Sequence, residues 1–87
     1  MKVYKHVIEN PTPGERFRVG EVYSFGVDPQ GQLCIWFEGS ENPLFDEWDA
    51  VLVFTGQDIP LKEDEVCMFK GSVQWRGLMW HLFLLFE

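Results

Sequence analysis

The chain has 87 residues, with 14 Asp or Glu against seven Lys or Arg, and its formal net charge of -7 repels phosphate backbones. Direct binding to nucleic acid is therefore disfavoured, and a partner with a basic surface is favoured. A chain of this length supports one hydrophobic core, so we expect a single β domain over residues 1–87. The longest mostly apolar run, Leu78 to Phe86, is well short of the ~20 residues of a membrane-spanning helix. No secretory signal is recognised at the amino terminus, and we expect a cytoplasmic protein that does not bind membranes.

The first predicted strand covers Lys2 to Ile8, and the Pro- and Gly-containing segment 9–14 ends it. From residue 16 to residue 28 the apolar side chains fall mainly on odd positions, a period of two that predicts one face toward the core. Gly20 and Glu21 interrupt this row. The stretch is therefore either bent or bulged there, or divided into two strands.

The segment Asp28-Pro29-Gln30-Gly31 has the composition of a β-turn. Asp accepts hydrogen bonds from nearby backbone N–H groups, Pro restricts φ, and Gly adopts a positive φ. We predict a hairpin around this turn that pairs Val27 with Leu33, Phe25 with Ile35 and Tyr23 with Phe37.

Residues Glu38 to Pro43 are predicted to be a loop, and Leu44 to Asp46 either continue it or make a short turn. The next strand begins at Trp48, with Trp48, Ala50, Leu52 and Phe54 on one face. Residues 56–60 break this strand. Residues 61–65 are expected to be a loop, with one short helical turn as the alternative, because five residues rarely hold a helix alone.

The final hairpin turns at Gly77. A two-residue loop at Arg76 and Gly77 predicts an apolar face with these pairs: Trp75 with Leu78, Val73 with Trp80, Gly71 with Leu82, Phe69 with Leu84 and Cys67 with Phe86. The alternative, a four-residue loop from Gln74 to Gly77, shifts the partners by two and keeps the same faces. The opposite face is mixed, with Ser72 near His81. Because Leu78 to Phe86 is apolar on both faces, we expect it to be an interior strand.

Roughly five to six strands without a long helical period predict an all-β fold, a small antiparallel sandwich or half-open barrel. We expect Trp80 to lie in the core. Trp36 and Trp48 are candidates either for the core or for an interface.

No sequence motif indicates catalysis. His6 and His81 are the only near-neutral bases, and no nucleophile or phosphate-binding motif accompanies them, so we predict no enzymatic activity. Cys34 and Cys67 lack the local spacing of a metal site or a disulfide framework. We expect both thiols to be reduced and buried, and we expect no metal and no other cofactor.

Two acidic clusters are the candidate partner-binding residues. Carboxylates on one surface can bind arginines or lysines of another protein, and the alternative role is to keep an aromatic-rich domain soluble. The candidates are Asp46, Glu47, Asp49, Glu63, Asp64 and Glu65.

Several segments, taken together, resemble a family of short uncharacterised bacteriophage proteins that end in a Trp-His-x-Phe hairpin. The segments are Lys2-Val3-Tyr4-Lys5, Gly31-Gln32-Leu33-Cys34-Ile35-Trp36, Phe54-Thr55-Gly56-Gln57-Asp58-Ile59-Pro60, Gly71-Ser72-Val73-Gln74 and Gly77-Leu78-Met79-Trp80-His81-Leu82-Phe83. The chain departs from the family pattern at Phe54, where the family has a loop glycine, and in its longer ending. The resemblance implies a phage origin, and therefore the cytoplasm of a host cell, and a small β fold. It implies no site residues.

Charge and resemblance together predict a non-enzymatic, acidic protein-binding module. Its partner would be a host protein with a basic patch, for example a nucleic-acid-handling or defence protein that it inhibits. The alternative is a structural or assembly protein that self-associates through the mixed face of the last hairpin and completes its core as a homodimer.

Overall fold

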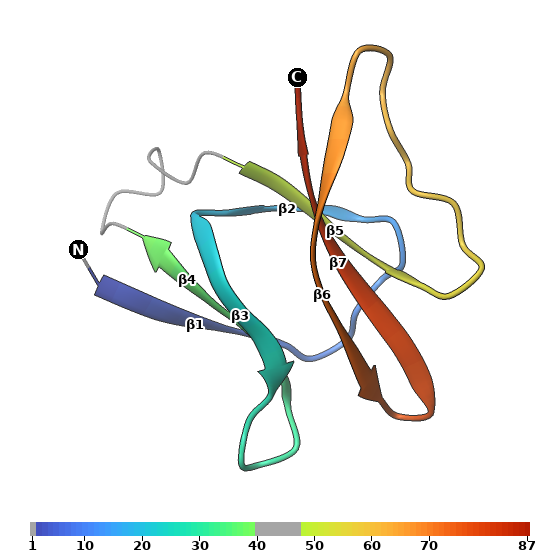
Figure 1. The fold of residues 1–87 in the computed structure, drawn as a ribbon. Coiled ribbons are helices and arrows are strands. Elements are labelled where there is room, and N and C mark those ends of the chain that lie inside the picture. The colour runs from blue at the N-terminus through green and yellow to red at the C-terminus, as the bar shows by residue number, and fades with distance from the viewer. Residues whose placement is uncertain (1, 40–47) are drawn as a thin grey trace.

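The computed structural model describes residues 2–39 and 48–87. Within these ranges seven strands form two antiparallel sheets (Figure 1). The three-stranded sheet has the order β1-β4-β3, and the four-stranded sheet has the order β2-β5-β7-β6. The strands are β1 (Lys2–Ile8), β2 (Arg16–Val19), β3 (Glu21–Val27), β4 (Leu33–Gly39), β5 (Trp48–Phe54), β6 (Val66–Trp75) and β7 (Leu78–Phe86). The all-β fold expected from the sequence is confirmed, and its two packed sheets make it a sandwich, one of the two expected architectures.

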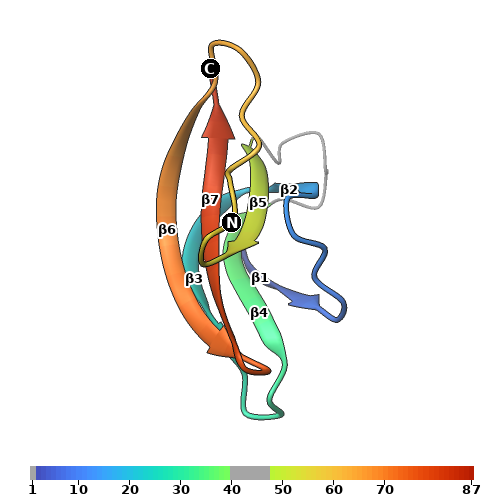
Figure 2. The same ribbon diagram turned by 90° about the vertical axis from the view of Figure 1, so that its right-hand side faces the viewer.

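The two sheets enclose one main core. Val22, Leu33 and Ile35 of the three-stranded sheet pack against Leu52 and Leu82 of the four-stranded sheet. Strand β7 lies between β5 and β6, as Figure 2 shows, so the apolar ending is the interior strand that its composition predicts. Trp80 is buried, as expected. No helix of the described residues is long and apolar enough to cross a membrane.

The chain passes from one sheet to the other at Gly20. Strand β2 pairs with β5 and strand β3 pairs with β4, so the stretch from residue 16 to residue 28 is two strands. This division raises the number of strands to seven, above the five to six expected. Gly20 is buried, and a Cβ atom placed there would lie 1.9 Å from the carbonyl oxygen of Glu38. Only a residue without a side chain permits this approach of the two backbones.

The turn between β3 and β4 follows its sequence pattern. Oδ1 of Asp28 accepts hydrogen bonds from the backbone N–H groups of Gln30 and Gln32, at 3.0 and 2.8 Å. Gly31 has a positive φ of 80°. Oδ2 of Asp28 accepts from Nζ of Lys5 at 2.7 Å, and this contact holds the pKa of the Asp28 carboxyl below its usual value. The turn is therefore attached to β1 as well as to its own hairpin.

The register of this hairpin is as predicted for Val27 with Leu33 and for Phe25 with Ile35. The predicted pair of Tyr23 with Phe37 is wrong, because a register shift between Val22 and Ser24 places Val22 opposite Phe37. The predicted loop also starts too early, since β4 continues through Glu38 to Gly39. A bulge reverses the faces of all residues beyond it, so Val22 is buried and Tyr23 is exposed.

The last hairpin also contains a register shift that reverses the faces of the side chains beyond it. The pairs from Trp75–Leu78 to Gly71–Leu82 are as predicted. A register shift between Phe69 and Gly71 then pairs Phe69 with Phe83 and Cys67 with Leu85, so the two predicted pairs beyond it are wrong. Cys67 is consequently exposed, whereas Cys34 is buried as expected. Ser72 faces His81, as predicted, with Oγ of Ser72 2.6 Å from Nδ1 of His81.

Candidate protein-binding surface

The predicted acidic residues have different environments. Asp46 and Glu47 lie outside the described residues. Asp49, on β5, accepts hydrogen bonds from Arg16 at 3.2 Å and from Arg18 at 3.0 Å. The two arginines alternate along β2, so both project from the face on which Asp49 lies. The Asp49 carboxylate is therefore already bound within the chain.

Glu65 is also bound within the chain. Its two carboxylate oxygens accept from the Arg16 guanidinium at 2.5 and 2.7 Å, and one of them also accepts from the backbone N–H of Lys62. Arg16 also donates to the carbonyl oxygen of Pro60. These contacts attach the loop of residues 55–65 to β2. The structure thus brings Asp49 and Glu65 together through Arg16, and it leaves Glu63 and Asp64 exposed in the turn before β6.

The two hydrogen bonds from the Arg16 guanidinium to the Glu65 carboxylate predict a pH-dependent contribution of Glu65 to stability. The hydrogen bonds from Arg16, followed by the one from the Lys62 backbone, lower the pKa of Glu65 from its usual 4.5 to about 2. Since the folded-state pKa is depressed, the stabilisation is complete above pH 4.5 and is lost as the pH falls through about 2. We expect Glu65→Gln to lower Tm at neutral pH and to approach the Tm of the wild type as the pH falls to about 2 and below. Thermal denaturation across this pH range measures the difference.

Glu63→Gln is the matched control for this prediction. It removes the same charge from the same loop, but Glu63 is exposed and forms no ion pair with a described residue. Its Tm should follow that of the wild type at every pH. Equal Tm values for Glu65→Gln and the wild type at neutral pH would contradict a structural role for Glu65.

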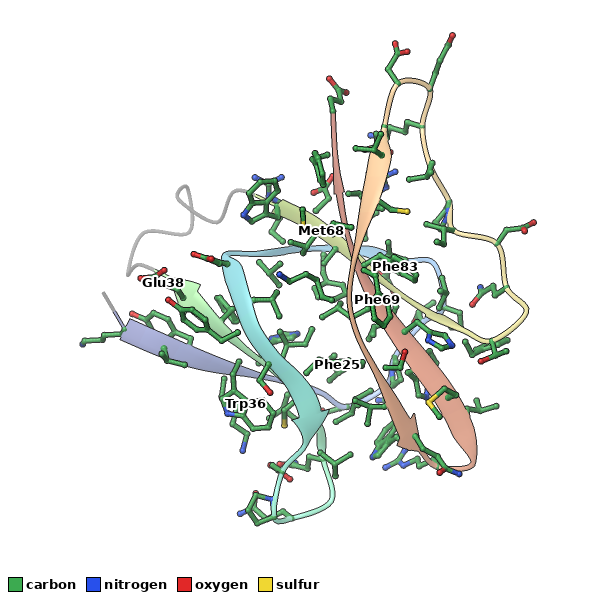
Figure 3. The ribbon with its side chains drawn as sticks, viewed as in Figure 1. Phe25, Trp36, Glu38, Met68, Phe69 and Phe83 are labelled. Carbon is green, nitrogen blue, oxygen red and sulfur yellow. The ribbon has the colours of Figure 1, made fainter. Side chains whose placement is uncertain are left out.

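The first part of strand β6 is exposed on both of its faces. We call Val66, Cys67, Met68 and Phe69 the β6 edge. Val66, Met68 and Phe69 retain 51%, 45% and 57% of their accessible surface. Val66 and Met68 lie on the face of the four-stranded sheet that faces the main core, where Met68 pairs with Leu84. Cys67 and Phe69 lie on the opposite, outer face of this sheet. Figure 3 shows Met68 and Phe69 on the part of β6 away from the hairpin turn, with Phe83 beside Phe69.

The register shift at Lys70 explains why this part of β6 is uncovered. Beyond the shift, Gly71 lies against Phe25 of β3, which covers the second part of β6. Before the shift, β7 is the only described strand that pairs with β6. Natural edge strands are usually protected by charged residues or proline. The β6 edge has neither.

One end of the β6 edge is acidic. Glu63 and Asp64 precede it, and Val66 pairs with Phe86, next to Glu87. Figures 1 and 2 both place the carboxyl terminus beside the turn that leads into β6. The arrangement is an uncharged apolar strip with carboxylates at one end, which suits a segment with apolar and basic residues.

Sequence reasoning missed the β6 edge because it assumed an unbulged hairpin. A glycine inside a strand often marks a bulge, and Gly71 stands directly after the inserted Lys70. A bulge predicted at this glycine would have placed Phe69 and Cys67 on the outer face of the sheet.

The remaining candidate residues have local partners. The ring nitrogens of His81 lie 2.6 Å from the Ser72 hydroxyl and 2.8 Å from the Thr55 hydroxyl. No three His, Cys, Asp or Glu side chains of the described ranges converge as metal ligands. Trp48 and Trp36 are both half-buried: Trp48 packs edge-on against Phe86, and Trp36 packs over Gly26.

No family model, no curated protein and no solved structure matches the chain. The resemblance to short bacteriophage proteins stays a prediction.

Proposed function

We propose that the chain is a non-enzymatic protein-binding module that receives an extended, basic segment of a partner protein along the β6 edge. The observation that carries this proposal is the β6 edge itself. It has four consecutive exposed residues, none of them charged, on a strand with one hydrogen-bonded neighbour in the described part of the chain.

Strand addition suits this edge physically. An edge strand directs unpaired N–H and C=O groups away from the sheet, and a partner segment in extended conformation can pair with them. Alternate side chains of that segment would contact Val66 and Met68 on one face and Phe69 on the other. Burial of these partly exposed apolar groups would add to the free energy of binding.

Charge favours a basic partner over a neutral one. The net charge is -7, and the exposed carboxylates of Glu63, Asp64 and Glu87 surround one end of the β6 edge. Arginine or lysine residues flanking the apolar positions of the partner would be steered toward this end. Asp49 and Glu65 contribute to the field but keep their bonds to Arg16, so reversing their charge would test the fold more than the interface.

The resemblance to phage proteins supports a phage-encoded module that acts on a host protein in the host cytoplasm. Proteins that bind nucleic acid have extended basic surfaces, so a nucleic-acid-handling or defence protein of the host is the partner class that we propose. A module that covers such a surface would compete with the nucleic acid and inhibit the host protein.

Selection of a random peptide library on the purified chain tests the proposal. We expect enriched peptides that alternate apolar with other residues and carry Arg or Lys at one end. Phe69→Lys should weaken a selected peptide by about tenfold or more, because it removes an apolar contact of roughly 1.5 kcal/mol and adds a repelling charge. Fluorescence anisotropy measures the affinities.

Met79→Lys is the matched control. Met79 is also an exposed apolar residue of this hairpin, but it lies at the turn end, away from the β6 edge. Its affinity for the peptide should stay within about twofold of the wild type. Equal losses in the two variants would show that charge alone, and not the β6 edge, determines binding.

A second copy of the chain is the alternative occupant of the β6 edge. Two identical edges could pair across a two-fold axis, although two chains of net charge -7 repel each other. Sedimentation of the wild type and of Phe69→Lys at high micromolar concentration separates the two cases. If the wild type is a dimer and Phe69→Lys is a monomer, the occupant of the β6 edge is a second copy of the chain and not a basic partner.

A further inference from the structure

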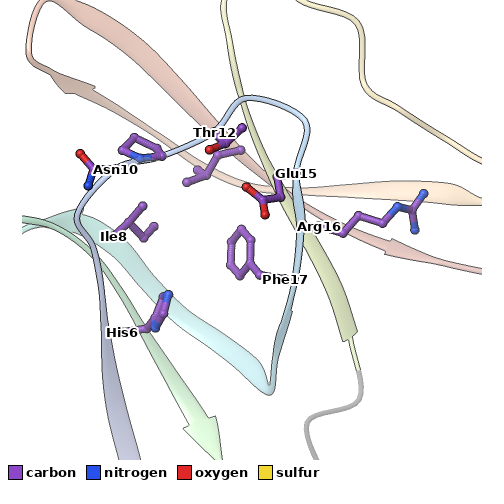
Figure 4. A pocket seen from close by; sticks show the side chains of 9 residues that line it. His6, Ile8, Asn10, Thr12, Glu15, Arg16 and Phe17 are labelled. Atoms are coloured by element: carbon purple, nitrogen blue, oxygen red, sulfur yellow. The ribbon is translucent and has the colours of Figure 1, made fainter.

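A pocket lies at the opposite pair of sheet edges from β6, where β1 and β2 end their respective sheets. Figure 4 shows it between these strands and the connecting segment 9–15. Its volume is about 220 Å³, below the ~300–1,000 Å³ of pockets for drug-sized ligands. The pocket therefore suits one side chain or a small molecule of similar size.

The lining combines an apolar wall with several polar groups. Ile8, Phe17 and Leu52 form the wall, and the ring of His6 stacks on Phe17 with centroids 6.1 Å apart. The polar lining residues are His6, Asn10, Thr12, Glu15 and Arg16. A ligand that fits this lining needs a flat or aliphatic part and several hydrogen-bond donors.

The local sequence places Glu15 at this pocket. The N–H of Glu15 donates to the carbonyl oxygen of Thr12 at 3.1 Å, and Gly14 has a φ of 80°, which with Pro13 before it is the pattern of a type II turn. The N–H of Gly14 donates to the carbonyl oxygen of Leu52 at 2.9 Å. The turn is thus attached to β5, and Glu15 has a defined position above Phe17 (Figure 4).

Among the described residues that line the pocket, Glu15 is the one carboxylate, and it has no ion-pair partner among them. It forms no ion pair with any described residue, whereas Arg16 points away from the pocket and is held by Glu65 and Asp49. A cation in the pocket would therefore meet a carboxylate without meeting a free positive charge. The net charge of -7 adds a favourable long-range field.

We propose that this pocket binds one guanidinium group on a short aliphatic stem. The planar guanidinium lies against the ring of Phe17 and donates two parallel hydrogen bonds to the Glu15 carboxylate. The aliphatic stem contacts Ile8 and Leu52. An ammonium group fits less well, because it neither stacks on a ring nor donates in a bidentate fashion. The guanidinium can belong to an arginine of a protein or to a free small molecule, and in either case its site is independent of the β6 edge.

Titration followed by ¹H–¹⁵N NMR tests the proposal with four probes. Agmatine represents the free small molecule, and acetyl-Ala-Arg-Ala-amide represents a protein side chain. The corresponding citrulline and lysine peptides are the controls, since citrulline keeps the shape of arginine without its charge. We expect saturable shifts at residues 6–17 and 52 with agmatine or the arginine peptide, and at least about tenfold weaker binding of the citrulline and lysine peptides.

Glu15→Gln should weaken binding of the guanidinium probes by about tenfold or more, because the charge-assisted bidentate contact is lost. Glu9→Gln is the matched control: it removes one exposed carboxylate outside the lining, and its affinity should equal that of the wild type. If the arginine peptide binds more tightly than agmatine, the source is a protein, and the reverse order indicates a free guanidine compound. Absence of saturable shifts at millimolar concentration, equal binding of citrulline, or an unchanged affinity of Glu15→Gln would overturn the proposal.

Discussion

Gly20→Ala should destabilise the fold by about 3 kcal/mol or more, because the new methyl group has no space. The Cβ atom would stand 1.9 Å from the Glu38 carbonyl oxygen, and that oxygen belongs to the backbone of β4. A flexible side chain could move aside, but β4 is the central strand of the three-stranded sheet and can move only if its pairing with β1 and β3 is disturbed. A chain of 87 residues has a total stability of roughly 4–13 kcal/mol, so this single methyl group should remove a large part of it.

Gly26→Ala is the control for this prediction. Gly26 lies on β3, and a Cβ atom there would meet a ring atom of Trp36 at 3.7 Å, an ordinary contact. Its effect should be within about 1 kcal/mol of zero. Urea denaturation followed by tryptophan fluorescence measures both variants. Similar stabilities for the two would show that the crossing of the chain at Gly20 does not need a glycine.

Leu82→Ala should cost about 3–5 kcal/mol, near the upper end of values for buried leucines. Leu82 is at the centre of β7 with no exposed surface. Its cross-strand neighbour on β6 is Gly71, which has no side chain that could move into the cavity. The space left by the truncated leucine would therefore stay open, and the cost of an open cavity adds to the lost transfer free energy.

Leu78→Ala makes the same chemical change at the start of the same strand. Leu78 retains 45% of its surface, so the variant should lose less than about 1 kcal/mol. Equilibrium unfolding in urea again provides the measurement. A loss for Leu82→Ala no greater than that for Leu78→Ala would contradict an interior position of β7.

The candidate site was only partly accessible to sequence reasoning. Composition alone establishes an acidic protein, because charge is additive over the chain, and the basic partner is a prediction from that charge. It does not reveal which carboxylates are free. Glu65 meets Arg16 across 49 positions, and this contact exists only after β2 and the loop before β6 have been brought together. The exposed carboxylates of Glu63 and Asp64 differ from Glu65 in their surroundings and not in their chemistry.

The pocket beside Glu15 also forms only when segments that are distant in sequence come together. Its lining comes from β1, the segment 9–15, β2 and Leu52 of β5, and the sequence contains no motif that joins them. The turn at Pro13 and Gly14 is legible in the sequence, since proline and glycine have known backbone preferences. That this turn rests on the carbonyl oxygen of Leu52 is a long-range fact.

Local patterns were sufficient for strand β1, for the turn at Asp28 and for the interior strand β7, because side-chain alternation and turn chemistry depend on neighbouring residues. They were sufficient also for the all-β class. The division of residues 16–28 between two sheets, the two register shifts and the exposure of Phe69 were decided by tertiary packing. A bulge adds one residue to a strand and so reverses every later side chain, and whether it forms depends on which strand lies opposite. The opposing strand is distant in sequence, so a short segment of the sequence does not show whether a bulge forms.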